Sequence, residues 1–337
     1  MSREDDLSTA DAVVVGGFRE KDGGGASGTD GDVGGTAADA LVVSVAGAFE
    51  RAGLCVGRAS GRAARHRRQL ADALFAAVRD GVGEDANRPR RPRVVAIVGL
   101  GGESGSFREA SLASDFLEDA ELRWRVRHFT MRGGVVLVHG RGGAIDTLMH
   151  DWFAKPWTSG LTRKNVTWTY NDRSAWGGGY FGRYNASAAH GSGGAPTRLE
   201  PRAVVELERV GPADRVFASS ADEMVTAVAL GTYGGGHVGY FGDADAEEAT
   251  LAVVAALAEA APGAGSADGV RRLRASPLAS IGMVDPEAWT DDRDVPKGGD
   301  GGRVRKPSVA AFACYAACTL AITVAFVAGS AKLILMS

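Results

Sequence analysis

Two uninterrupted apolar runs constrain the fold of this chain more than any other feature. Residues 93–100 (RVVAIVGL) and 134–139 (GVVLVH) lack the alternating polar residues of a strand that has one solvent-exposed face. Each run therefore indicates a strand buried on both faces. Glycine-rich bends and then helix patterns follow both runs. Strand, bend and helix in this order predict an α/β fold with a mainly parallel sheet and helices on both faces.

Weaker patterns extend this prediction along the chain. Further strands are expected at 12–17, 54–56, 165–170 and 237–243, and helices at 37–52, 61–80, 111–129, 144–153, 221–230 and 245–261. Residues 202–210 and 215–218 are expected to form an antiparallel pair at one edge. These elements make up one domain over 12–262, which includes a low-complexity insertion at 22–36. Residues 1–11 are expected to be disordered, and 263–308 to form a flexible linker.

Composition and charge exclude some classes of function. The 337 residues are 45% hydrophobic and 23% charged, which suffices for a sizeable core. A net charge of -3 gives no general attraction to nucleic acid, so no nucleic-acid partner is expected. The segment 58–93 is locally basic. It is either a solvated helix face with a loop or a surface for anionic lipid.

Cysteine and glycine spacing argue against a metal or a dinucleotide cofactor. The three cysteines, Cys55, Cys314 and Cys318, show no metal-ligand spacing and no disulfide framework. This usage fits a reducing compartment. The stretch GLGGESG is not a dinucleotide fingerprint, because Ser104 stands where the third glycine is expected. We therefore expect neither a metal nor another cofactor.

A hydrophobic segment near the C-terminus predicts membrane attachment. Residues 309–331 contain no charge and would span roughly 35 Å as a helix, enough to cross a hydrocarbon core of about 30 Å. The basic residues Arg303, Arg305 and Lys306 precede it, and the N-terminus lacks the features of a signal peptide. The pattern is typical of a tail-anchored, single-pass protein whose soluble part faces the cytosol. The alternative is a buried core helix.

Three segments together resemble the class I glutamine-amidotransferase-like superfamily, in its trehalose-utilisation-type branch. They are MRGGVVLVHGRGG (131–143), WFAKPW (152–157) and YGGGHVGYFGDADAEEAT (233–250). The resemblance covers about residues 93–262, with 12–56 as a looser first unit. It implies a flavodoxin-like three-layer sandwich. In the active glutaminases of this family, a cysteine occupies the bend after the strand, and a histidine and a glutamate follow late in the chain.

The chain departs from that pattern at its centre. Arg141 stands where the resemblance places the cysteine, and arginine remains protonated and is not a nucleophile. No serine or cysteine lies in this bend, so cysteine-dependent glutamine hydrolysis is not expected. The late strand holds His237 at its start and Asp243 at its end, and both are expected to serve strand and turn structure.

The two glycine-rich bends are nevertheless the candidate ligand site, because ligands bind at the carboxyl ends of parallel strands. Arg141, among backbone donors at a helix N-terminus, suits an anion, although a solvent-facing turn arginine is the simpler interpretation. The candidate ligand-binding residues are Gly101, Gly102, Gly140, Arg141, Gly142 and Gly143. The acid–base candidates are His139, Glu103 and Asp146, although His139 also suits a supporting role and Glu103 a helix cap.

Three functional hypotheses remain open. The first is a tail-anchored protein whose disarmed domain binds a small anionic or sugar-like ligand or a protein partner. The second is a hydrolase or isomerase that uses His139, Glu103 and Asp146 in one crevice. The third is a scaffold that brings a partner to a membrane through the basic segment 58–93. A cluster of aromatic residues between Trp152 and Tyr184 is either packing or a stacking surface for a sugar or a protein.

Overall fold

A computed structural model describes residues 7–16, 18, 37–79, 92–101, 114–174, 196–219, 222 and 224–259. The chain divides into two units, Met1–Pro296 and Lys297–Ser337, and all described residues belong to the first. The predicted insertion 22–36, linker 263–308 and membrane segment 309–331 lie outside the described residues. Within the described ranges, no helix has the length and apolar character needed to cross a bilayer.

A sheet of parallel strands forms the centre of the fold, as the apolar runs predict. Its strands are β1 (Ala12–Gly16), β2 (Val56–Ser60), β3 (Val94–Leu100), β4 (Val135–Gly140) and β11 (Gly236–Phe241). They lie in the order β2-β1-β3-β4-β11, and each pairs in parallel with its neighbour. Every residue of β4 and β11 is buried, because both faces of the sheet are covered.

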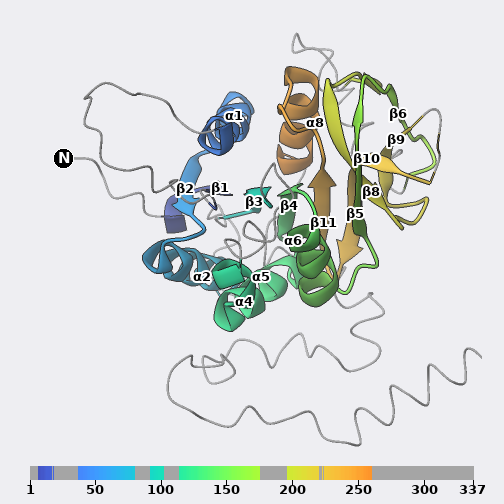
Figure 1. The fold of residues 1–337 in the computed structure, drawn as a ribbon. Coiled ribbons are helices and arrows are strands. Elements are labelled where there is room, and N and C mark those ends of the chain that lie inside the picture. The colour runs from blue at the N-terminus through green and yellow to red at the C-terminus, as the bar shows by residue number, and fades with distance from the viewer. Residues whose placement is uncertain are drawn as a thin grey trace, which may run out of the picture. The chain divides into compact units, whose positions relative to one another are not determined.

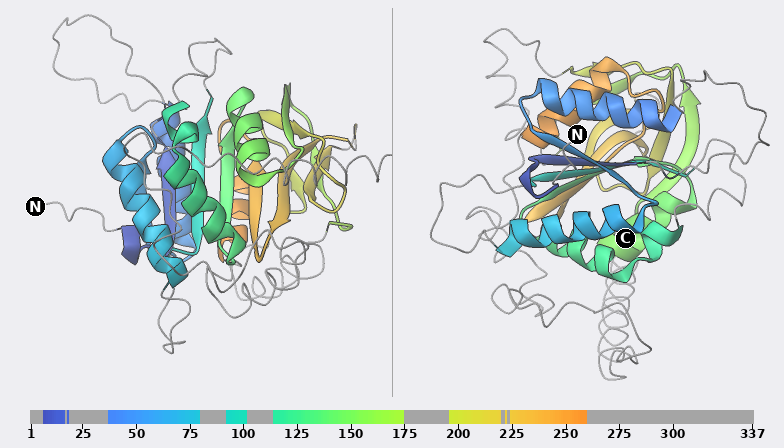
Figure 2. Two further views of the ribbon diagram at one scale, coloured as in Figure 1. Left: turned by 90° about the horizontal axis from the view of Figure 1, so that it is seen from below. Right: turned by 90° about the vertical axis from the view of Figure 1, so that its left-hand side faces the viewer.

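Helices cover both faces of this sheet (Figures 1 and 2). One face carries α1 (Ala37–Arg51) and α8 (Glu248–Glu259), and the other carries α2 (Ala64–Arg79), α4 (Ser114–Glu118) and α5 (Ala120–Met131). Successive side chains of β3 therefore point alternately into two hydrophobic cores, one on each face of the sheet. Val94 and Ala96 pack in the core that includes α1 and α8, whereas Val95 and Ile97 pack in the core of the opposite face. This arrangement explains why the run 93–100 shows no polar alternation.

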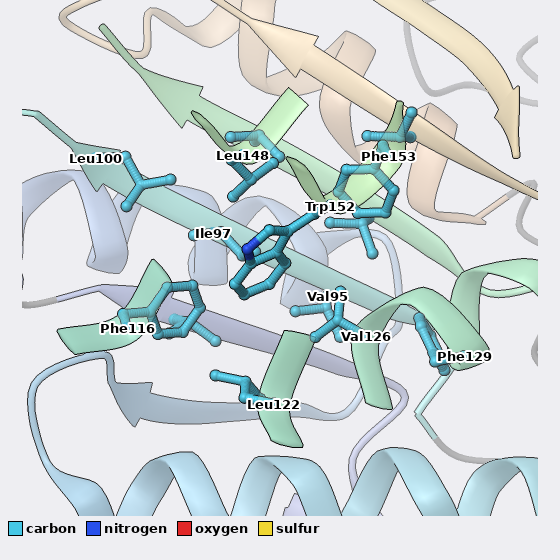
Figure 3. Close-up of a cluster of buried hydrophobic side chains, with 14 of the residues drawn as sticks. Val95, Ile97, Leu100, Phe116, Leu122, Val126, Phe129, Leu148, Trp152 and Phe153 are labelled. Carbon is cyan, nitrogen blue, oxygen red and sulfur yellow. The ribbon is translucent and has the colours of Figure 1, made fainter. Parts of the chain in front are cut away.

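A group of large aromatic side chains holds the segment after β4 in place (Figure 3). The chain continues from β4 into α6 (Gly143–Thr147) and a π-helical turn, η3 (Leu148–Trp152). Trp152 is fully buried and stacks on Phe116, with ring centroids 5.4 Å apart. Its indole Nε1 donates to the Leu117 carbonyl oxygen at 3.3 Å. Trp152 thereby fixes the helical segment after β4 against α4.

An antiparallel extension begins at β11. Its strands are β5 (Thr158–Lys164), β6 (Trp168–Tyr170), β7 (Arg198–Leu199), β8 (Ala203–Glu208), β9 (Arg215–Ser219) and β10 (Thr226–Tyr233). β10 pairs with β11 on one side and with both β8 and β9 on the other. β6 then pairs with β9 and β7, and β5 pairs with β8.

Two predictions fail in this extension. The expected helix over 221–230 is wrong, because a tight turn with Gly234 at φ +62° folds β10 back onto β11 as a hairpin. The expected pairing of 202–210 with 215–218 is also wrong, because β8 and β9 each pair with β10. A short apolar run has no periodicity that separates helix from strand, so tertiary pairing decided its conformation.

The ordered chain begins earlier than predicted. Leu7–Thr9 form a 3-10 helix, and Leu7 is 3% exposed. The Leu7 side chain packs closely against Gly57 of β2, since a Cβ added to Gly57 would lie 2.9 Å from it. The predicted disorder of residues 1–11 is therefore wrong for the part from Leu7 onward, since this leucine packs against the edge strand.

The carboxyl ends of β3 and β4 approach each other so closely that glycine is required. A Cβ built on Gly140 would lie 2.1 Å from the carbonyl oxygen of Leu100. A Cβ on Gly101, whose φ is +81°, would lie 2.3 Å from the carbonyl oxygen of Arg141. Both contacts are with backbone, which has no alternative rotamer to adopt. The two bends can therefore touch only because these positions carry no side chain.

We expect Gly140→Ala to destabilise the domain by on the order of 2–3 kcal/mol, because the new methyl group overlaps backbone in a packed region. Gly143→Ala is the matched control, since its Cβ would meet nothing within 4 Å. The control should change stability by no more than about 0.5 kcal/mol. Thermal unfolding of the full chain in lipid nanodiscs measures both. Equal midpoints for the two variants would contradict the close contact.

Candidate functional site

The bend between β4 and α6 has its first two amide groups already engaged. The Arg141 N–H donates to the Leu100 carbonyl oxygen at 2.8 Å, which extends the pairing of β3 with β4. The Gly142 N–H donates to Ser159 Oγ at 2.8 Å. Gly142 adopts φ +65° and ψ -158°, a conformation essentially restricted to glycine. The position whose backbone conformation requires a glycine is thus Gly142, and Arg141 does not adopt such a conformation.

Asp146 and Ser159 fasten α6 to β5. The Ser159 N–H donates to Asp146 Oδ1 at 2.7 Å, and Ser159 Oγ accepts from the bend as described above. The carboxylate of Asp146 therefore holds the strand next to the bend. Neither β5 nor Ser159 was predicted, because TSGLTRK shows neither an apolar run nor regular alternation.

His139 is a buried neutral base at the end of β4. Its Nε2 lies 3.0 Å from the Asp243 carbonyl oxygen, which only accepts, so Nε2 carries the proton. Burial lowers the pKa of His139 to about 4; the hydrogen bond to Asp243 opposes this shift, and the charge of Arg141 adds to it. Its Nδ1 is buried and has no hydrogen-bond partner among the described residues. His139 also contacts the Phe241 ring at 5.1 Å between centroids.

Asp243 caps the turn that leads into α8, in agreement with its expected role. Its Oδ1 accepts from the Asp245 N–H at 3.1 Å, and its Oδ2 accepts from the Glu247 N–H at 2.9 Å. Burial raises the pKa of Asp243, while hydrogen bonds from Thr250 and from the Glu247 and Asp245 amides act against that rise. Its side chain serves the turn, and its carbonyl orients His139.

Tyr240 connects the bend to the antiparallel extension. Its hydroxyl is buried and lies 3.0 Å from the Gly140 carbonyl oxygen and 2.9 Å from the Val205 carbonyl oxygen. Burial raises the pKa of this phenol well above its ordinary value, and the negative charge of Asp146 raises it further. The hydroxyl therefore remains protonated and acts as a donor. Tyr240 was not predicted as a site residue, because a tyrosine in an apolar strand resembles a core residue.

The structure brings together some of the predicted site residues and separates others. Gly101, Gly140, Arg141 and Gly142 meet where the ends of β3 and β4 touch. Gly143 follows them as the first residue of α6. The acid–base candidates His139 and Asp146 have different hydrogen-bond partners, and Glu103, like Gly102, lies outside the described residues. The described part of the chain holds no group of three side chains suited to a metal ion.

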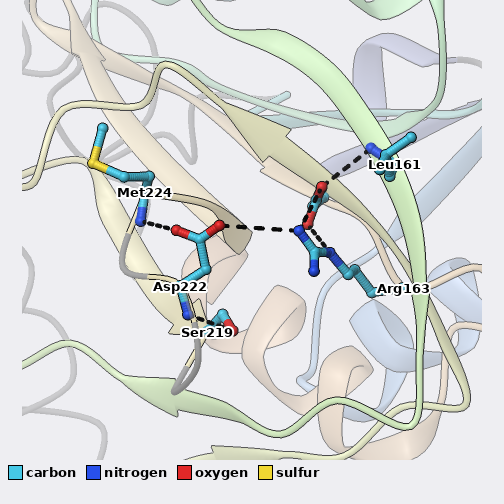
Figure 4. A network of polar contacts seen from close by, with 6 residues as sticks. Leu161, Arg163, Ser219, Asp222 and Met224 are labelled. Carbon is cyan, nitrogen blue, oxygen red and sulfur yellow. Dashed lines mark hydrogen bonds and ion pairs between the residues drawn. The ribbon is translucent and has the colours of Figure 1, made fainter.

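A second polar network in the antiparallel extension was not predicted (Figure 4). The register of β5 against β8 shifts between Ser159 and Thr162. Within this shift, the Leu161 N–H donates to one carboxylate oxygen of Glu206 at 3.3 Å. Arg163 Nε donates to the other oxygen at 2.7 Å, and this guanidinium also lies 4.0 Å from Asp222. Glu206 is 1% exposed, so Arg163 neutralises a carboxylate that would otherwise be buried alone.

Comparison with known proteins adds no assignment to this site. No protein-family model matches the chain, and a search of curated proteins also finds no match.

The buried histidines make stability depend on pH. The folded-state pKa of His139, about 4, lies below the ordinary value of 6.5, so the unfolded chain takes up the proton first as pH falls. The contribution of neutral His139 to the free energy of unfolding is therefore fully present above pH 6.5. It decreases by roughly 3 kcal/mol as the pH falls from 6.5 to 4. His128 acts in the same direction, because burial and the nearby Arg132 and Arg125 lower its pKa to about 3.

We expect His139→Gln to weaken this pH dependence, because glutamine keeps a donor for the Asp243 carbonyl but does not titrate. The exposed His150 provides the control His150→Gln, which should leave the dependence unchanged. Urea unfolding of each variant between pH 7.5 and 4.5 gives the comparison. A His139→Gln curve that parallels the wild type would show that this residue does not contribute.

Proposed function

We propose that the chain is a cysteine-less member of the class I glutamine-amidotransferase-like group and that its domain binds a ligand or partner instead of hydrolysing glutamine. The order β2-β1-β3-β4-β11 supports a flavodoxin-like three-layer sandwich, because it matches the strand order 2-1-3-4-5. The helices on both faces and the glycine-dependent bend after β4 agree with that architecture.

The observation that carries the proposal is the chemistry of the bend. Arg141 stands where the resemblance places a cysteine, and a protonated guanidinium is not a nucleophile. The amides of Arg141 and Gly142 donate to Leu100 and Ser159, so neither is positioned to stabilise an oxyanion. The bend therefore lacks both the attacking group and these two donors. Its architecture is better suited to holding a ligand beside Arg141.

The chemistry of Arg141 favours an anionic ligand. A guanidinium at the carboxyl ends of β3 and β4 can donate two parallel hydrogen bonds to a carboxylate or phosphate. Because Arg141 lies close enough to His139 to lower its pKa, the positive charge acts inside the bend region. A sugar-like ligand or a protein partner at the same place is the alternative occupant.

An acid–base enzyme remains the second candidate, and one observation favours it. His139 Nδ1 is an acceptor buried without a partner among the described residues, as a base awaiting a proton would be. Its pKa of about 4, however, makes it a weak base at neutral pH, and Asp146 is bound to the Ser159 amide. Both observations weigh toward the binding function.

The proposal includes attachment of the domain to a membrane, with the domain facing the cytosol. Its support is the sequence of residues 309–331, which are uncharged for a length that crosses a bilayer and follow Arg303, Arg305 and Lys306. A polar, glycine-rich stretch separates this segment from α8. The bound ligand or partner would then be presented at the cytosolic surface.

We expect anions such as phosphate or citrate to raise the unfolding midpoint of the full chain in nanodiscs. At 100 times Kd, one bound ligand would stabilise the domain by about 2.7 kcal/mol. Arg141→Gln should remove the effect, whereas Arg202→Gln, which changes an exposed arginine elsewhere, should not. An anion effect that survives Arg141→Gln would refute the site. Glutamine hydrolysis by the wild type would refute the non-catalytic assignment.

We expect the full chain to remain in the membrane pellet after extraction with alkaline carbonate, and a chain without residues 309–331 to be released. The sequons at Asn165 and Asn185 should carry no glycan, because the domain faces the cytosol. Release of the full chain by carbonate would contradict the membrane segment. A mass shift after glycosidase treatment would contradict the orientation.

A further inference from the structure

A hollow on the outer part of the antiparallel extension is separate from the bend. It has a volume of about 520 Å³ and is lined by Thr167, Thr169, Tyr170, Thr197 and Arg198. Its residues come from β6, β7 and the positions just before them, at the far end of the strand order from β4. The volume falls within the range of sites for small molecules, which is roughly 300–1,000 Å³.

Strand alternation explains why polar side chains line this hollow. Trp168 pairs with Leu199, and both side chains are buried in the core. The next pair, Thr169 with Arg198, must point to the opposite face of the hairpin, and both residues are exposed. Burial of the tryptophan thus directs a threonine hydroxyl and a guanidinium outward together.

The charges around the hollow disfavour an anion. Arg198 forms an ion pair with Glu200 at 2.5 Å and donates to Thr167 Oγ1 at 3.2 Å, so its charge and one of its donors are engaged. Burial raises the pKa of Tyr170, a hydrogen bond with Ser174 acts against that rise, and the negative charge of Asp172 adds to it. Among the described residues that line the hollow, Arg198 is the only charged one, and its charge is paired with Glu200.

The lining instead suits a neutral ligand with many hydroxyl groups. The three threonine hydroxyls each donate and accept, which matches groups that do the same. Tyr170 packs its ring against Phe217 at 5.7 Å between centroids and contributes only the remaining accessible part of its side chain to the lining, and sugars present C–H groups as well as hydroxyl groups. We propose that the hollow formed by Thr167, Thr169, Tyr170, Thr197 and Arg198 binds a neutral sugar, independently of the anion at Arg141.

The test is saturation-transfer NMR on the full chain in nanodiscs, with glucose and maltose as probes at about 10 mM, a concentration suited to the millimolar affinity of a weak open site. We expect saturation transfer to the sugar ring protons in the wild type. The transfer should decrease by about threefold or more in Thr169→Val, since valine fits a strand but lacks the hydroxyl. Thr162→Val makes the same change at an exposed position of β5 and should leave the signal unchanged.

Two further measurements distinguish this site from the bend. The sugar signal should persist in Arg141→Gln and in the presence of excess phosphate. The proposal is overturned if the wild type shows no transfer, or if Thr162→Val reduces the signal as much as Thr169→Val. It is equally overturned if phosphate or Arg141→Gln abolishes transfer while Thr169→Val preserves it, because the sugar would then occupy the bend.

Discussion

The backbone contact between the carboxyl ends of β3 and β4 is the constraint on which the rest of the structure depends. Arg141 N donates to the Leu100 carbonyl oxygen, and glycines at 101 and 140 remove the side chains that would hold the strands apart. The contact sets the direction in which α6 leaves the sheet. The π-helical turn after α6 then brings Trp152 against Phe116, so the bend and one face of the core are formed together.

Most polar groups near the bend brace neighbouring strands. Asp146 and Ser159 join α6 to β5, Tyr240 joins Gly140 to β8, and His139 joins β4 to the turn after β11. Because buried polar groups are costly unless they are paired, these contacts stabilise the region while removing donors that catalysis would need. The use of these polar groups in structural hydrogen bonds supports the proposed binding function over hydrolysis.

The antiparallel extension and its polar contacts were the least predictable part. At the register shift in β5, the Leu161 N–H donates to the Glu206 carboxylate rather than to a strand partner. Arg163 Nε donates to the other oxygen of the same carboxylate. Each of these residues resembles an ordinary surface residue in the sequence. Only pairing between segments more than forty positions apart buries Glu206 and gives the arginine its function. The pairing of β6 with β7 brings Thr169 and Arg198 together.

The sequence by itself determined the parallel centre of the sheet, the helices that cover it and the bend at Arg141, because uninterrupted apolar runs and glycine positions are local properties. It also determined that the bend carries no nucleophile. Tertiary structure alone decided that 226–233 is a strand, that the first two bend amides are engaged, and that His139 is neutral with Nε2 protonated. Each of these depends on a partner distant in sequence, since burial and hydrogen bonding, rather than residue type, set the conformation and the proton.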